Sequence, residues 1–165
     1  MGNVKLRKFE ERDVPNKVKW INDEENNQYL HYDLPLIEEK TYEWYRNLVG
    51  REDRYDAVIL YDDIPVGIIG LLGIREGRAE YYVTMGEKVY KGKGIAKEAT
   101  KILLQYAFTN LNLKEVYLYT EEENIGAQRL FEKCGFERQF LEKDSARNRG
   151  KSVNRFFYKI KNSNG

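Results

Sequence analysis

Cysteine and histidine are almost absent from this chain of 165 residues, which has Cys134 as its one cysteine and His31 as its one histidine. An intrachain disulfide requires two cysteines, so none can form. A structural zinc site usually takes four cysteine or histidine ligands. We therefore expect no disulfide framework and no bound metal.

Long apolar runs and an excess of charge of one sign are also missing. The longest apolar run, 68–74, is much shorter than the ~20 residues of a transmembrane helix, and no apolar leader follows the first residue. The 28 basic residues nearly balance the 27 acidic ones, whereas nucleic-acid-binding proteins usually have a clear basic excess. We expect a cytoplasmic protein that binds neither a membrane nor nucleic acid.

Internal repeats, low-complexity tracts and flexible linkers are not found, which favours a single domain over residues 1–165. Alternating apolar residues and turn signals predict strands at 4–9, 57–61, 66–74, 79–85, 116–120, 136–142 and 153–160. Apolar residues at helical spacing predict helices near 13–21, 42–48, 95–107 and 127–134. A polar loop ending at Gly150 is expected between the last two strands.

These predicted elements begin with hairpins and continue with a β-α-β crossover. The predicted fold is therefore α/β (α+β mixed), with a mixed, mostly antiparallel central sheet and helices on both faces.

A glycine-rich segment stands between the fourth predicted strand and the longest predicted helix. Its sequence is Lys91-Gly92-Lys93-Gly94-Ile95-Ala96. The glycines let the backbone come close to a ligand, and the helix start presents unpaired N–H groups and the positive end of its dipole. These features predict a pyrophosphate site, although a glycine turn before a solvated basic helix is the simpler explanation of this segment alone.

Two common phosphate loops do not match this segment. A Walker loop ends in Gly-Lys-Ser or Gly-Lys-Thr, and neither Gly-Lys pair here is followed by Ser or Thr. A dinucleotide-binding loop would have glycine in place of Lys97 and would follow the first strand of a parallel unit. Both loops are set aside.

A second motif follows the fifth predicted strand and reads Asn124-Ile125-Gly126-Ala127-Gln128-Arg129-Leu130-Phe131-Glu132-Lys133-Cys134-Gly135-Phe136. Together, the two motifs resemble those of the GCN5-related N-acetyltransferase (GNAT) superfamily. Its acetyl-CoA loop reads Arg/Gln-x-x-Gly-x-Gly/Ala, and its next block reads Asn-x-x-Ala-x-x-Leu-Tyr-x-Lys-x-Gly-Phe. Ala79-Glu80 at the start of the fourth predicted strand and residues 108–113 before the fifth resemble the branch containing ribosomal-protein, spermidine and nucleotide-amino-sugar N-acetyltransferases.

This resemblance implies the GNAT fold and the transfer of an acetyl group from acetyl-CoA to a primary amine. In the family, the fourth and fifth strands splay apart and the cofactor lies between them. The implied cofactor-binding residues are Met85, Gly86, Glu87, Lys91, Gly92, Lys93, Gly94, Ile95, Ala96, Lys97, Asn124, Phe131 and Lys133. No metal is implied, and a homodimer remains open.

Acetyl transfer needs one group that takes the amine proton and another that protonates the departing thiolate. Glu80 lies where relatives carry an acidic residue near the acceptor, so we expect it to act as the base or to attract the ammonium group. Phe131 stands where many relatives have the tyrosine that serves as the acid, and phenylalanine has no proton to give. Tyr119 is the expected substitute, whereas Cys134 shares an apolar helix stripe and is expected to be a buried, inert thiol.

In the resembling fold, the acceptor pocket is formed by the first two helices, their loop and the final hairpin. We expect His31, Tyr32 and Tyr82 to bind the acceptor, and strand alternation places Tyr82 on the same face as Glu80. Residues 22–43 are acidic and would suit a polyamine, whereas the basic final segment would suit an acidic amino sugar. The acceptor remains open among a peptide N-terminus, a polyamine and an amino sugar.

Two classes of function remain. The first is an N-acetyltransferase that works by direct transfer in a ternary complex. The second is a catalytically weak acetyl-CoA-binding or regulatory module, which Phe131 favours because the usual acid is missing.

Overall fold

The computed structural model describes residues 2–163, which form seven strands and five α-helices together with two 3-10 helices. The strands are β1 (Val4–Lys8), β2 (Tyr55–Tyr61), β3 (Ile64–Arg75), β4 (Arg78–Met85), β5 (Glu115–Glu121), β6 (Glu137–Asn148) and β7 (Lys151–Lys161). The helices are α1 (Val14–Asn22), α2 (Glu24–Asn27), α3 (Glu38–Leu48), α4 (Ile95–Thr109) and α5 (Ile125–Lys133), with η1 (Glu11–Asp13) and η2 (Lys88–Tyr90).

All seven strands form one sheet in the order β1-β2-β3-β4-β5-β7-β6. Neighbouring strands are antiparallel except β4 and β5, which are parallel. A parallel connection requires a long crossover, and α4 provides it. The mixed, mostly antiparallel sheet that was predicted is confirmed.

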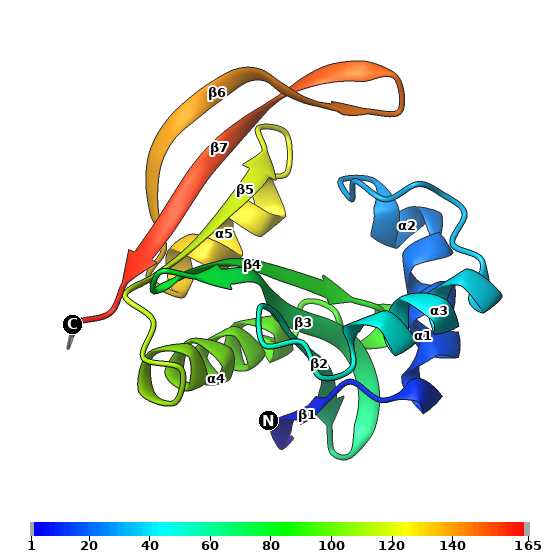
Figure 1. Ribbon diagram of the computed structural model, residues 1–165. Coiled ribbons are helices and arrows are strands. Elements are labelled where there is room, and N and C mark those ends of the chain that lie inside the picture. Colours follow the sequence, from blue (N-terminus) through cyan, green and yellow to red (C-terminus); the bar gives the residue numbers. More distant parts are fainter. Residues whose placement is uncertain (1, 164–165) are drawn as a thin grey trace.

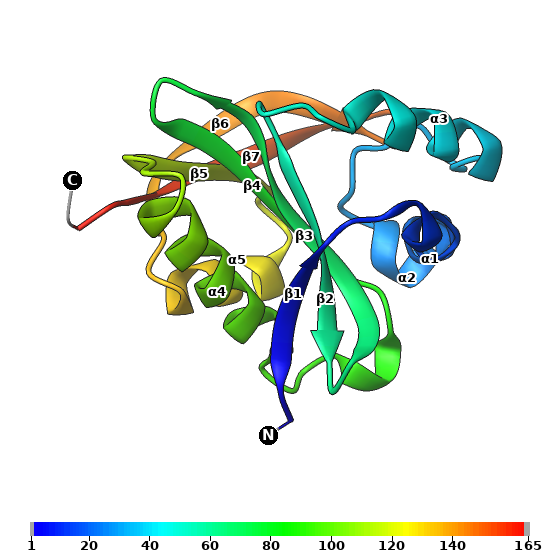
Figure 2. The same cartoon turned by 60° about the horizontal axis from the view of Figure 1, so that its bottom comes forward.

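Helices lie on both faces of the sheet, as predicted. Figure 2 shows α1, α2 and α3 on one side of the strands and α4 and α5 on the other. A buried cluster holds the first group to the sheet and consists of Phe9, Val14, Trp20, Ile21, Val58 and Ile68. The β6–β7 hairpin extends beyond the end of β5 (Figure 1).

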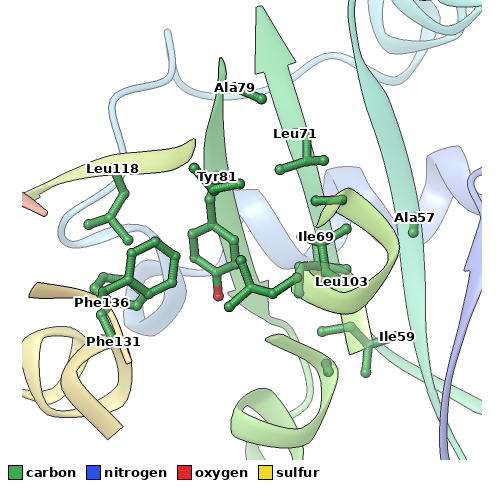
Figure 3. Packing of buried hydrophobic residues seen from close by; sticks show 14 of the residues in the cluster. Ala57, Ile59, Ile69, Leu71, Ala79, Tyr81, Leu103, Leu118, Phe131 and Phe136 are labelled. Carbon is green, nitrogen blue, oxygen red and sulfur yellow. The ribbon is translucent and has the colours of Figure 1, made fainter. Parts of the chain in front are cut away.

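The main core lies between the sheet and α4. The predicted stripe of this helix is confirmed, because Ile95, Ala99, Leu103 and Ala107 are at most 1% exposed. Tyr81 of β4 lies in the middle of this core, with the aromatic rings of α5 and its following turn on one side and Leu103 on the other (Figure 3). This packing fixes β4 and the start of α4 relative to each other.

Two expectations about the elements were wrong. The short helix α2 was not predicted, and it begins where the Asp23 side chain accepts a hydrogen bond from the N–H of Glu25 at 3.0 Å. The expected polar loop before Gly150 is mostly strand, because β6 continues to Asn148 and the turn is limited to 149–150. β6 is an edge strand with mostly exposed side chains, so its sequence lacks the apolar alternation of a half-buried strand.

Candidate active site

The parallel strands β4 and β5 separate soon after they pair. Their register covers only 78–80 of β4 and 115–117 of β5. Further along, residues 82–85 and 118–121 line one cavity, and the strand edges that face each other there are not paired. Free main-chain groups of this kind can bind an extended ligand as an added strand. The splayed strands implied by the family resemblance are therefore present.

The glycine segment lines the same cavity. Gly92 and Gly94 have left-handed φ angles of 75° and 80°, and Gly94 is the N-cap of α4. The first hydrogen bond of the helix runs from the N–H of Glu98 to the carbonyl of Gly94 at 3.1 Å, so the N–H groups of the first turn have no intrahelical acceptor. Lys91 and Lys97 also line the cavity, so the start of α4 is suited to bind a pyrophosphate.

The cavity has a volume of about 1020 Å³ and extends from the glycine segment to the loop after α2 and to Arg155 of β7. It brings together most of the predicted site residues. Those that line it are His31, Tyr32, Glu80, Tyr82, Met85, Lys91, Gly92, Gly94, Ile95, Ala96, Lys97, Tyr119, Asn124, Phe131 and Lys133.

Three predicted cofactor-binding residues, Gly86, Glu87 and Lys93, are not part of the cavity lining. The N–H groups of Gly86 and Glu87 both point to the carbonyl of Val66, at 2.7 and 3.3 Å. A Cβ on Gly86 would lie 2.2 Å from the ring of Trp20, whose Nε1 donates to the Glu87 carboxylate at 2.5 Å. This turn therefore faces α1, and the part of β4 that lines the cavity ends at Met85.

Glu80 lies half-buried in the cavity wall. Its carboxylate has no hydrogen bond or ion pair with any of residues 2–163, although the positive charge of Arg155 is near. Burial raises the pKa of Glu80, and Arg155 opposes that shift with a smaller effect. A carboxylate with a raised pKa and free oxygens is suited to accept a proton at neutral pH.

The groups considered as proton donors differ in their surroundings. Tyr119 lines the cavity, and burial, with a smaller effect of Glu142, raises the pKa of its hydroxyl. Phe131 is 7% exposed, and its ring centre lies 5.6 Å from that of Tyr81. Cys134 does not line the cavity and is partly buried against the core, less buried than expected. Burial raises the pKa of its thiol, which agrees with low reactivity.

The far end of the cavity is held together by Glu121, which the sequence did not single out. Its carboxylate is 2.8 Å from Nε2 of His31 and accepts a hydrogen bond of 2.6 Å from Nδ2 of Asn148. Asn148 also donates to the carbonyl of Gln28 at 2.9 Å. The end of β5, the loop after α2 and the tip of the β6–β7 hairpin therefore meet here. Alternation with Tyr119 along β5 is the signal that could have placed Glu121 on the cavity face.

A second group of contacts crosses three strands. The hydroxyl of Tyr82 donates to Asp56 at 2.5 Å, and it passes over Gly70, where a Cβ would lie 2.6 Å from the ring. Arg54 binds the same carboxylate through Nε and Nη2 at 2.8 and 2.9 Å. Arg54 and Tyr82 both line the cavity. Nothing in the local sequence around Arg54 distinguishes it from a surface arginine, so sequence reasoning missed it.

Residues 3–137 match a family model described as an acetyltransferase (GNAT) domain. The chain belongs to the GNAT acetyltransferase family. Spermidine N(1)-acetyltransferase of Escherichia coli K12 is 31% identical over 143 residues, which are 81% of this chain and 73% of the relative. The uncharacterized N-acetyltransferase p20 of Bacillus licheniformis is 28% identical over 116 residues, which cover 69% of this chain and 65% of p20, just under two thirds of its length.

Solved structures show the same fold. The spermidine N-acetyltransferase of Vibrio cholerae in complex with CoA and spermine has a TM-score of 0.91, with 97% of this chain and 96% of that chain covered at 23% sequence identity. This GNAT protein is therefore an N-acetyltransferase that uses acetyl-CoA, and its glycine segment and splayed strands suit that cofactor.

Within residues 2–163, no group of three or more His, Cys, Asp or Glu side chains is arranged to hold a metal ion. No helix of the same residues is long and apolar enough to cross a membrane.

Proposed function

We propose that this GNAT enzyme acetylates a small primary amine whose nitrogen is held and deprotonated by Glu80. The observation that carries this proposal is the position of one carboxylate. Glu80 has no protein partner for its oxygens among the described residues and lies in the same cavity as the glycine segment and the free edges of β4 and β5.

The cofactor end of the cavity supports binding of acetyl-CoA, which supplies the acetyl group as a thioester. First-turn N–H groups of α4, together with Lys91 and Lys97, would hold the pyrophosphate. Asn124 uses its Oδ1 to cap α5 through the N–H of Ala127 at 3.2 Å, which leaves its amide nitrogen for a further bond. These residues hold the cofactor in place but take no part in moving a proton.

Glu80 carries the chemical step on the acceptor side. It receives the proton that the amine nitrogen loses as the new C–N bond replaces the C–S bond. The departing thiolate must gain a proton, which Tyr119 or water would provide, because Phe131 has none. A thiol is acidic enough to leave partly as an anion near neutral pH, so a strong acid at this position is not essential.

The acceptor panel follows from the relatives and from the sequence. Because relatives of the chain are spermidine N(1)-acetyltransferases, a polyamine is the first compound to assay. A peptide with a free N-terminus and an amino sugar complete the panel.

The experiment measures CoA thiol release in the steady state with acetyl-CoA and each amine of the panel. We expect turnover with at least one amine and none without an acceptor. Tight binding of acetyl-CoA without turnover on any amine would contradict the proposal and would favour the weak acetyl-CoA-binding module.

Two expectations accompany this proposal. A cytoplasmic location stays a prediction that fractionation of cells would check. Self-association is open to light scattering, and a structure of the Vibrio cholerae relative is dodecameric.

A further inference from the structure

Three residues form a row across the acceptor face of the sheet. Leu72 of β3 lies directly opposite Glu80 of β4. Arg54 stands two residues before Asp56, and Asp56 lies opposite Gly70, two residues before Leu72. Side chains two residues apart on a strand share a face, so Leu72 and Glu80 lie on the face of Gly70 and Tyr82. Arg54 immediately precedes β2 and reaches the same face, because it binds the Asp56 carboxylate that also accepts from Tyr82. Two strand spacings place the backbones of Arg54 and Glu80 about 10 Å apart. All three residues of the row line the cavity.

Three carboxylates line this cavity, and two of them have partners. Glu25 lies 3.0 Å from the ammonium group of Lys88, and Glu121 is held by His31 and Asn148. Glu80 alone lacks a hydrogen bond or ion pair within residues 2–163. The described part of the cavity wall therefore offers one free carboxylate, which is enough for one ammonium group.

At the other end of the row, Arg54 keeps hydrogen-bond donors for a further group. Asp56 already accepts hydrogen bonds from Nε and Nη2 of Arg54 and from the hydroxyl of Tyr82. Nη1 of Arg54 has no hydrogen-bond partner among residues 2–163, and the side chain is 19% exposed. A guanidinium that uses part of its fork on one carboxylate can bind a second anion with the rest.

A second cation lies behind Arg54. Lys17 of α1 is 6% exposed, and its ammonium group lies 3.3 Å from the centre of the Trp44 ring. It has no hydrogen bond or ion pair in the described part of the chain, and burial lowers its pKa to about 8. Arg54 and Lys17 are thus two cations around the single carboxylate of Asp56. The net charge of these three side chains is positive, and a positive, partly desolvated site attracts an anion.

We propose that the acceptor carries an acidic group, a carboxylate or a phosphate, which binds at Arg54 while its amine lies at Glu80. This inference rests on the proposed function, because it takes Glu80 as the amine site. Leu72 between the two charged ends would contact the apolar part or the ring of the acceptor. A polyamine suits this row less well, since its second ammonium group would meet Arg54.

The test compares acceptors that differ only in the acidic group. Isothermal titration calorimetry with the CoA-saturated protein uses glucosamine 6-phosphate against glucosamine, and 4-aminobutanoate against its amide. Saturating CoA keeps phosphate out of the glycine segment. Because a charge-assisted hydrogen bond is stronger than a neutral one, we expect the acidic member of at least one pair to bind about tenfold tighter or more. The pair that shows the preference distinguishes a phosphate from a carboxylate. Equal or weaker binding of the acidic member in both pairs would overturn the inference.

Parallel turnover assays separate this inference from the proposed function. Turnover of glucosamine without any preference for acidic compounds overturns the inference and leaves the proposed function intact. A binding preference without turnover of any amine overturns the proposed function and supports the acidic subsite.

Substitution of Arg54 tests whether this residue causes the tighter binding of the acidic acceptor. Arg54→Gln should reduce the preference to about threefold or less, because the free donors are lost. Arg51→Gln is the matched control, since Arg51 binds Asp53 through two nitrogens at 2.8 and 2.5 Å outside the cavity. An unchanged preference in Arg54→Gln would overturn the assignment. If that variant does not fold, Lys17→Met serves instead, and the preference should fall at least twofold; an unchanged preference there has the same meaning.

Discussion

The two ends of the cavity are built in different ways. The cofactor end consists largely of main-chain groups, namely the first turn of α4 and the unpaired edges of β4 and β5. The acceptor end consists of side chains from α2 and the loop after it, from Arg54 just before β2, and from β3, β4, β5 and the β6–β7 hairpin. Contacts between residues far apart in the chain join these side chains. A main-chain site depends on local conformation, whereas a side-chain site depends on the register of the whole sheet. Substitutions at the two ends should therefore have separable effects.

Gly94→Val should have the largest effect, and it should be confined to the cofactor end. Gly94 has a φ of 80°, and a β-branched residue disfavours this conformation and displaces the N–H groups of the first turn of α4. Loss of two charge-assisted hydrogen bonds, worth about 3–6 kcal/mol, would weaken acetyl-CoA binding by about a factor of 100 or more. Calorimetry with acetyl-CoA measures this change.

Gly50→Val is the control for this substitution. Gly50 has a similar φ of 84°, and no atom lies within 4 Å of the position of an added Cβ. This variant should carry the same backbone strain and keep normal affinity for acetyl-CoA. Wild-type affinity in Gly94→Val would show that the glycine segment does not bind the cofactor.

Glu80→Gln should have the next largest effect, at the acceptor end only. A general base contributes about 100- to 10,000-fold to the rate, so kcat should fall within that range while the Kd of acetyl-CoA stays unchanged. Glu137→Gln changes an exposed carboxylate of β6 outside the cavity and should leave both quantities as they are. A loss of cofactor affinity that matches the loss of rate would contradict the separation of the two ends.

Lys17→Met tests whether Lys17 is a buried, charged side chain, because the charge makes the free energy of unfolding depend on pH. Burial lowers the pKa of Lys17 to about 8 in the folded protein, so between pH 8 and pH 10.5 the unfolded chain binds the proton more strongly. The wild-type free energy of unfolding should therefore rise with pH through this window. Below pH 8, the charged Lys17 destabilises the folded protein to its full extent. Relative to Lys17→Met, we expect a gain on the order of 3 kcal/mol from pH 7 to pH 10.5. Urea unfolding at several pH values measures it, and a pH-independent difference would argue against a buried charged lysine.

Phe131→Tyr should have the smallest effect. Phe131 lines the cavity between the cofactor end and the acceptor end. The added hydroxyl restores the proton donor of the resembling family, and we expect kcat to rise by about tenfold or less, since the thiolate can also be protonated by water. The residue is 7% exposed, so a hydroxyl without a partner would lower stability by about 1–3 kcal/mol. Thiol-release kinetics and chemical unfolding measure the two changes. A fall in kcat would mean that the enzyme does not need an acid at this position.

The sequence signals of the cofactor end are local, and most of the residues expected there line the cavity, although their roles stay predictions. The glycine segment, the helix stripe that contains Ala99 and Leu103, and the block that begins at Asn124 each lie within a short stretch of chain. The exceptions are Lys93, which lies outside the cavity lining, and the turn at Gly86 and Glu87, whose N–H groups point to Val66. That contact depends on the pairing of β3 with β4, which the residues of the turn do not encode.

The acceptor end was predicted less completely. His31, Tyr32 and Tyr82 were expected to bind the acceptor, and all three line the cavity, but their roles stay predictions. Arg54 and Glu121 were missed, because their positions follow from strand register and from the length of the β6–β7 hairpin. The hairpin was expected to be shorter, so the contact of Asn148 with Glu121 could not be anticipated.

The most direct test of the central claim is the pH dependence of kcat/KM for the best amine at saturating acetyl-CoA, in the wild type and in Glu80→Gln. If Glu80 must be ionised and the amine neutral, log kcat/KM should rise with a slope of about two below the pKa of Glu80 and about one above it. Because burial raises that pKa, the break should lie above the ordinary range of a glutamate, and it should vanish in Glu80→Gln. The same break in both proteins would contradict the assignment of Glu80 as the group that takes the proton of the amine.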